Sequence, residues 1–153
     1  MSVSTLNQFE PDVLPGQIAL TAGHHHNILN VMLMPTALTT YAGVSAGYAV
    51  SWQQGESLTP LVKNAMENAS DAQIGVALVS QKKDDYVSGD MLEIATNNTD
   101  IYVLASGAIS RGDNVYSASQ GTVSKAGSGN PVLGVALDDA ADGQVFRIRV
   151  RGI

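Results

Sequence analysis

Apolar and polar residues alternate along the C-terminal part of the chain, and this period of two predicts β-strands. Between residues 145 and 151, the apolar side chains of Phe146, Ile148 and Val150 are interleaved with arginines. Because side chains two residues apart lie on one face of a strand, we expect these three residues to face the core. Residues 101–104 read Ile-Tyr-Val-Leu and predict another strand. The predicted fold class is all-β.

Three blocks of sequence occur twice in the same order, which predicts an internal duplication. Residues 74–78 read Ile-Gly-Val-Ala-Leu, and residues 133–137 read Leu-Gly-Val-Ala-Leu. One related block precedes each copy and another follows it, at residues 42–51 and 106–117 and at residues 88–94 and 142–148. Because the three matches are in register, we predict that Gly75 and Gly134 occupy equivalent positions.

The repeat suggests how the 153 residues are divided. A chain of this length fits one compact domain or two very small ones. We predict two small units resembling a β-barrel or β-tulip, at residues 41–97 and 98–153, that share one core. Val135 and Leu137 are expected to belong to that core. Residues 1–40 have no counterpart in the second unit and are predicted to form an extended arm.

Prolines make a long helix unlikely in this arm. Pro11, Pro15 and Pro35 each lack a backbone donor and favour an extended preceding residue. An extended apolar arm would bury little on its own subunit, so docking on another subunit is a reasonable hypothesis. The alternative is that residues 18–20 pair within the subunit. The apolar residues predicted to form an interface with a partner or with another subunit are Leu14, Ile18, Leu20, Ile28 and Leu33.

The segment from residue 57 to residue 71 has two interpretations. Thr59 as N-cap and Pro60 at the first helical position would begin a short helix. The equivalent segment of the second unit, residues 120–130, is rich in Gly and Ser and predicts a hairpin strand and loop. We favour a strand through about Val62 followed by a helical turn.

Composition and charge exclude several classes of function. The net charge of −6 argues against a nucleic-acid-binding protein, which would present a basic surface. The chain has no cysteine, so it can form neither a disulfide nor a thiolate metal site. No apolar run is long enough for a membrane helix and no cleaved signal is recognisable, so we expect a soluble protein. Charged residues make up only 14% of the chain, against roughly 25% in an average soluble protein, which suggests a largely covered surface.

Candidate catalytic or metal-binding groups are few. The histidines at residues 24–26 would point to alternating faces of an extended chain, so they predict a polar turn rather than a metal site. Asp138, Asp139 and Asp142 could bind a cation or act as acid and base, but solvated loop acids are the favoured interpretation. The Arg-Gly-Asp sequence at residues 111–113 is interpreted as a turn rather than an adhesion motif. We predict a protein that is not an enzyme and needs no cofactor.

The C-terminal arginines are the only concentrated positive charge in the chain. Arg147, Arg149 and Arg151 would lie on one face of a strand, where like charges repel unless acidic groups oppose them. A solvated edge that discourages aggregation is one interpretation. We favour a role between subunits. The partners considered are a neighbouring subunit, a larger assembly to which the protein binds, or Glu93, Asp138 and Asp139 of the same chain.

The repeated motifs resemble the capsid decoration, or cement, proteins of tailed bacteriophages. The resemblance covers about residues 42–150 and is strongest at residues 109–116 and 133–137. It implies a virion protein, made in the host cytoplasm, that binds the outside of the expanded capsid, bridges major capsid protein subunits and stabilises the head. It also implies self-association, as a homotrimer in preference to a dimer.

Two other classes of function compete with this interpretation. One is a small ligand-binding or enzymatic β-barrel that uses the loop acids or the histidines. The other is a biotinyl or lipoyl carrier, but Lys125 lacks the sequence context expected of a modified lysine.

Overall fold

The computed structural model describes eight stretches of the chain: residues 14–19, 27–33, 44–52, 61–64, 73–78, 85–86, 90–127 and 130–151. The described part is built from strands, with one 3₁₀ turn, η2, at Ser119–Gly121. The predicted all-β class is therefore confirmed. Leu20, the histidines at residues 24–26 and residues 1–13 lie outside the described residues. No helix in these stretches is long and apolar enough to cross a membrane.

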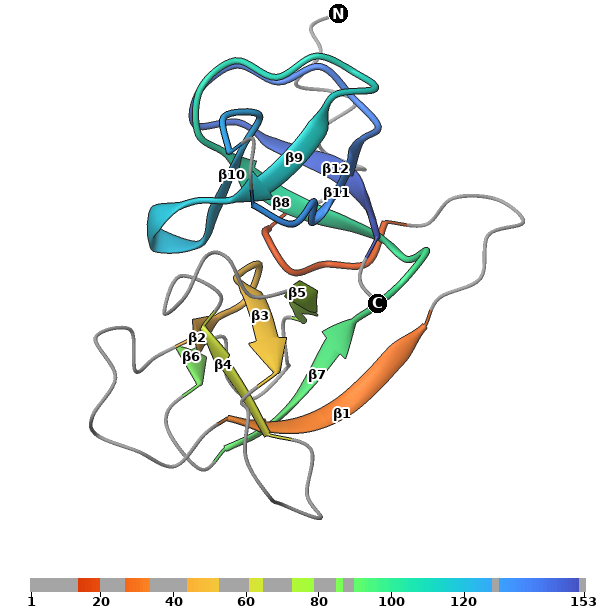
Figure 1. Cartoon of the computed structure of the whole chain (residues 1–153), viewed down its shortest axis with the longest axis vertical. Coiled ribbons are helices and arrows are strands. Elements are labelled where there is room, and N and C mark those ends of the chain that lie inside the picture. The colour runs from red at the N-terminus through yellow and green to blue at the C-terminus, as the bar shows by residue number, and fades with distance from the viewer. Residues whose placement is uncertain are drawn as a thin grey trace, which may run out of the picture.

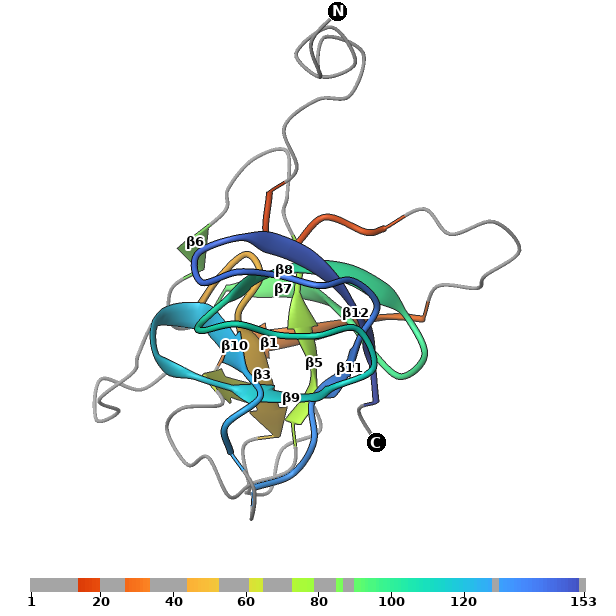
Figure 2. The ribbon, with the colours of Figure 1, turned by 90° about the horizontal axis from the view of Figure 1, so that it is seen from above.

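Two closed five-stranded barrels make up the fold (Figure 1). The strands of the first barrel are β1 (Ile28–Leu33), β3 (Ala49–Trp52), β4 (Leu61–Asn64), β5 (Gln73–Ala77) and β7 (Met91–Ala95). The strands of the second barrel are β8 (Asp100–Ala105), β9 (Asn114–Ser117), β10 (Thr122–Ser124), β11 (Gly134–Ala136) and β12 (Val145–Val150). A two-stranded sheet, β2 (Val44–Ser45) and β6 (Asp85–Tyr86), accompanies the first barrel. Seen from above, one barrel lies over the other (Figure 2).

The two barrels pair their strands in the same order. Around the first barrel the order is β1, β4, β3, β5, β7, and around the second it is β8, β10, β9, β11, β12. In each barrel one pairing is parallel, β1 with β4 and β8 with β10, and the other four are antiparallel. The registers also correspond, because Val50 pairs with Gly75 and Val115 pairs with Gly134. That the barrels arose by duplication stays a prediction.

Gly75 and Gly134 occupy matching positions in the two barrels. A Cβ atom on Gly75 would overlap the carbonyl oxygen of Ala95, and a Cβ atom on Gly134 would overlap that of Arg149. Both contacted residues belong to the last strand of their barrel. Each glycine therefore lets two strand backbones approach closely, which is why the Gly-Val-Ala block occurs in both halves.

The turns that precede β3 and β9 also match. Gly47 and Gly112 have φ angles of 89° and 92°, in the region that favours glycine. Their amides donate to the carbonyl oxygens of Ala77 and Ala136, each at 2.8 Å. The interpretation of Arg-Gly-Asp as a turn is thus confirmed at Gly112.

The buried apolar side chains form two clusters, and one of them extends across the contact between the barrels. Phe146, Ile148 and Val150 are buried in the second barrel, as predicted. The same cluster includes four residues of the first barrel's outer surface: Ala49, Val76, Leu78 and Ala95. A separate cluster fills the interior of the first barrel. The buried side chains of the described residues thus form two clusters, one of which contains residues of both barrels. That the two units share one core stays a prediction.

The expectation that Val135 and Leu137 are core residues is wrong. Both are only partly buried, because alternation along β11 places Gly134 and Ala136 inward and Val135 outward. Their equivalents behave differently: Val76 is fully buried because the second barrel covers that side of β5.

The boundary of the predicted arm at residue 40 is also wrong. Residues 28–33 form β1, which pairs with β7 over five residues and closes the first barrel. In the disputed segment after residue 57, residues 61–64 form strand β4 rather than a helix. Pairing with β1 and β3 supplies the backbone hydrogen bonds of β4, so the favoured strand interpretation is correct there.

Candidate interaction surfaces

Residues 14–19 lie between the two barrels and contact both of them (Figure 1). The amide of Gly16 donates to the carbonyl oxygen of Tyr102 at 2.8 Å, and the amide of Ala19 donates to that of Asp100 at 2.9 Å. A Cβ atom on Gly16 would lie only 2.8 Å from the side chain of Ala46 in the first barrel. We call residues 14–19 the clasp. Gly16 is required there, because its φ is +89° and a side chain would not fit.

The five apolar residues predicted for the interface have different positions. Ile18 pairs with Ile101 and packs on the second core, as the alternative of pairing within the subunit expected. Leu33 is buried in the first barrel and is not accessible to a partner. Leu14 and Ile28 are exposed, at 52% and 42%. Leu20 lies outside the described residues.

Arg147 is neutralised within its own chain. Its Nε and Nη2 atoms donate to Oδ2 and Oδ1 of Asp138 at 2.8 and 2.7 Å, so the two groups form a bidentate pair. This hydrogen bonding holds the pKa of Asp138 below its ordinary value, although partial burial opposes the shift. The same contact raises the pKa of Arg147. Asp138 was one of the partners considered from the sequence.

Arg149 is paired with a residue that the sequence analysis missed. Its Nε and Nη2 atoms donate to the carboxylate of Asp100 at 2.7 and 3.0 Å. Asp100 is fully buried at the start of β8, directly across from Arg149 in the β8–β12 register. Hydrogen bonding to Asp100 raises the pKa of Arg149. Arg147 and Arg149 therefore both find carboxylates within their own chain. A role of these arginines between subunits stays a prediction.

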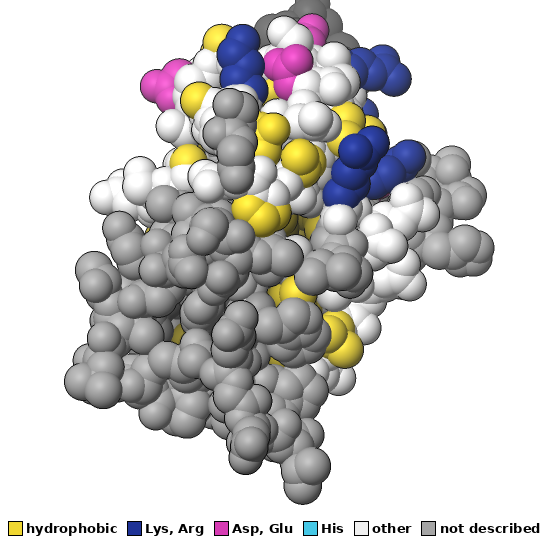
Figure 3. Space-filling model, viewed as in Figure 1, with side chains coloured by type: hydrophobic (Ala, Val, Ile, Leu, Met, Phe, Trp, Pro, Cys, Tyr) yellow, Lys and Arg dark blue, Asp and Glu magenta, His cyan; other side chains and the backbone are white. Residues whose placement is uncertain are grey.

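Arg151 differs from the other two arginines. It is exposed, and no described carboxylate pairs with it. It borders an open hollow of about 410 Å³ whose wall includes Val135, Leu137 and Arg149. On the face shown in Figure 3, the charged side chains of the described residues gather on the second barrel.

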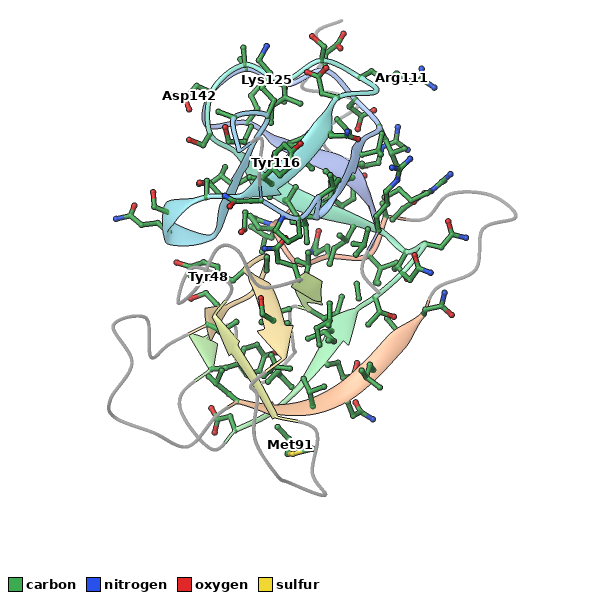
Figure 4. All side chains as sticks on the ribbon, in the orientation of Figure 1. Tyr48, Met91, Arg111, Tyr116, Lys125 and Asp142 are labelled. Atoms are coloured by element: carbon green, nitrogen blue, oxygen red, sulfur yellow. The ribbon has the colours of Figure 1, made fainter. Side chains whose placement is uncertain are left out.

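The loop acids of the second barrel act as acceptors for backbone amides. Asp142 accepts from the amide of Gly107 at 2.8 Å, and Asp139 accepts from the amide of Arg111 at 2.8 Å. Asp142, Arg111 and Lys125 mark the loops at the end of this barrel farthest from Met91 (Figure 4). Among the described residues, no group of three His, Cys, Asp or Glu side chains could hold a metal ion. These acids have a clear structural role, which is to fix the loops.

Comparison with known proteins decides the family. The sequence pattern of the structural cement proteins of phages (E217 gp24/Pam3 gp6) matches residues 4–151. The chain belongs to this family. The match spans both barrels and the clasp.

A solved structure supports the fold of this cement protein. The chain is similar to the N base of head fiber gp8.5 of bacteriophage phi29, with a TM-score of 0.57 and 19% identity. The similarity covers 82% of this chain and 94% of the phi29 chain. At this identity it shows the fold alone. No curated protein sequence matches the chain.

The missed residues of this cement protein carried only weak signals in the sequence. Asp100 follows the turn at residues 97–99, where it resembles a loop acid, and only the register with β12 shows that it faces Arg149. Gly16 follows a proline and resembles an ordinary turn residue. Its close contact with Ala46 depends on how the two barrels pack.

Proposed function

We propose that this cement protein binds the outer surface of the expanded phage capsid, bridges neighbouring major capsid protein subunits and so stabilises the head. The family match over residues 4–151 carries the proposal. The fold is compatible with it, because two barrels joined by a shared apolar contact and a clasp form one unit that can contact two neighbours.

The described residues suggest which side chains would contact a partner. Ile28, Leu14 and Arg151 are exposed and have side chains that a partner could contact. Each contact would be weak alone. Many identical copies, or a protein that associates with itself, would nevertheless bind tightly through a high effective concentration. We propose self-association as a homotrimer, with a dimer as the alternative.

A binding experiment with capsids tests this function. Purified protein is mixed with expanded capsids that lack it, and bound copies are counted as the protein concentration rises. We expect saturation at a fixed number of copies per capsid and a higher temperature of capsid disruption. Binding to unexpanded shells is the control. Binding that never saturates, or saturation without any gain in capsid stability, would contradict the proposal.

A further inference from the structure

Along its N-terminal half, strand β1 has an edge that no described residue covers. The carbonyl oxygen of Asn27 and the amide of Leu33 form backbone hydrogen bonds on the β7 side of the strand. Consecutive residues of a strand direct their backbone groups to opposite edges, so Ile28 and Asn30 direct theirs away from β7. On that side, pairing with β4 begins only at Met32. Within the described part of the chain, the N-terminal half of β1 therefore has an open edge.

The second barrel shows what such an edge accepts. In the shared register, Asp100 and Tyr102 of β8 correspond to Ile28 and Asn30 of β1. The clasp fills the edge of β8: Tyr102 both donates to Gln17 at 2.9 Å and accepts from Gly16 at 2.8 Å, and Asp100 accepts from Ala19. An extended, uncharged stretch of this same chain thus covers the edge of one barrel, and no described residue fills the matching place on the other barrel.

The equivalent residues of β1 and β8 also differ in how exposed they are to solvent. Residues 27–30 are all exposed, whereas residues 99–101 are all buried. Ile28 is 42% exposed and Leu29 is 36% exposed. Proteins usually protect bare edges with proline or with charged residues such as lysine. The sequence Asn-Ile-Leu-Asn at residues 27–30 has none of these, so the edge has the character of a surface that is covered in use.

We propose that residues 2–9 of a second copy of this chain pair with the open edge of β1. These residues carry no charged side chain and include Val3, Leu6 and Phe9. Four residues separate them from the clasp, and the 13 residues before Leu14 can extend to about 45 Å, so the segment can reach well beyond its own clasp.

The open edge is short, and this favours a single added strand over a folded surface as its partner. Three residues of strand are about 10 Å long. A stable contact between two globular faces needs about 800 Å² from each partner. An edge this short suits an added strand, which gains backbone hydrogen bonds and places an aliphatic side chain beside Leu29, as Ile18 lies beside Ile101. The inference rests on the self-association in the proposed function and names the contact that produces it.

Four variants of the whole chain test whether residues 2–9 of one copy pair with β1 of another. Ile28→Lys places a charge on the edge, Asn30→Pro removes the amide that faces the open side, and Leu6→Glu changes the incoming segment. Met91→Lys is the matched control, because Met91 is 57% exposed and apolar but lies on β7. Mass is measured by sedimentation velocity over a range of concentrations, and circular dichroism checks that each variant is folded.

We expect the unaltered protein to associate and the Asn30 amide to exchange slowly with solvent. Each of the three test variants should weaken association by about tenfold or more, since about three backbone hydrogen bonds are lost. Leu6→Glu should also restore fast exchange at the Asn30 amide, and Met91→Lys should change neither quantity.

Three results would overturn the inference. One is association that is equal in all four variants, which would locate the contact on another surface while leaving the capsid function intact. Another is a monomer whose Asn30 amide is protected and becomes exposed in Leu6→Glu, which would mean that the segment binds its own β1. The last is a monomer in which that amide always exchanges fast.

Discussion

The two barrels have the same strand register, yet their equivalent residues face different surroundings. Val76 of β5 is fully buried against the second barrel, and its equivalent on β11, Val135, borders an open hollow. Asp100 on β8 lies under the clasp, and its equivalent on β1, Ile28, is exposed. The barrels therefore have in common their inward side chains and the two close-packed glycines. The outward residues are decided by which neighbour covers them.

One matched pair of substitutions separates the stability cost of clashing with the clasp from the cost of backbone strain in the turn. Gly47 and Gly112 have the same backbone conformation, but a Cβ atom on Gly47 would overlap Pro15, and a Cβ atom on Gly112 would meet nothing within 4 Å. Gly112→Ala should cost about 1–2 kcal/mol through backbone strain alone. Gly47→Ala should cost about 3–4 kcal/mol, since overpacking is added. Urea unfolding measures both, and equal costs would show that the clasp does not pack on this turn.

The two ion pairs of β12 differ in burial and should differ in effect. Asp100→Asn leaves Arg149 beside a buried neutral group and should cost about 3 kcal/mol of unfolding free energy. Asp138→Asn breaks a pair that is partly exposed and should cost less than about 1 kcal/mol. Thermal and urea unfolding of the two variants give the comparison. A larger cost for Asp138→Asn than for Asp100→Asn would contradict the expectation that the buried pair contributes more to stability.

Truncating the equivalent valines tests the contact between the barrels. Val76→Ala removes methyl groups that are packed on both sides and should cost about 2 kcal/mol. Val135→Ala should cost less than about 1 kcal/mol, because its side chain already borders solvent. Equal losses would mean that the outer face of β5 gains little from the second barrel.

Acid should produce the smallest effect. The pKa of Asp138 is lowered in the folded protein, so its pairing with Arg147 stabilises the fold above the unfolded pKa of about 3.9. This contribution is lost as pH falls through the lowered folded pKa. Between pH 5 and pH 3 the stability difference between the unaltered protein and Asp138→Asn should shrink by about 0.5 kcal/mol. A difference that grows toward acid would contradict the direction of the shift.

Local sequence predicted what depends on local rules. The alternation in residues 145–151 placed Phe146, Ile148 and Val150 inward because a strand has a period of two. The repeated glycines marked equivalent turns and close strand contacts, because few other residues tolerate those positions. The family resemblance followed from the same repeated blocks and is confirmed.

Long-range pairing was beyond the reach of these rules. Residues 28–33 resemble any short apolar stretch, and membership of the first barrel depends on β7, about 60 residues later in the chain. Asp100 became a partner of Arg149 only through the register of β8 with β12. Ile18 and Leu33, both assigned to an interface, are used inside the subunit for the same reason.

The sequence by itself determined the strand period, the matching glycines and the inward residues of β12, since each depends on the geometry of a few neighbouring residues. The tertiary structure decided which outward residues are covered, which arginines find carboxylates and which strand edge stays open. Those outcomes depend on segments that are far apart in the chain and meet only when the barrels close and stack. Burial and charge pairing depend on contacts between these distant segments, so they cannot be inferred from any short stretch of sequence.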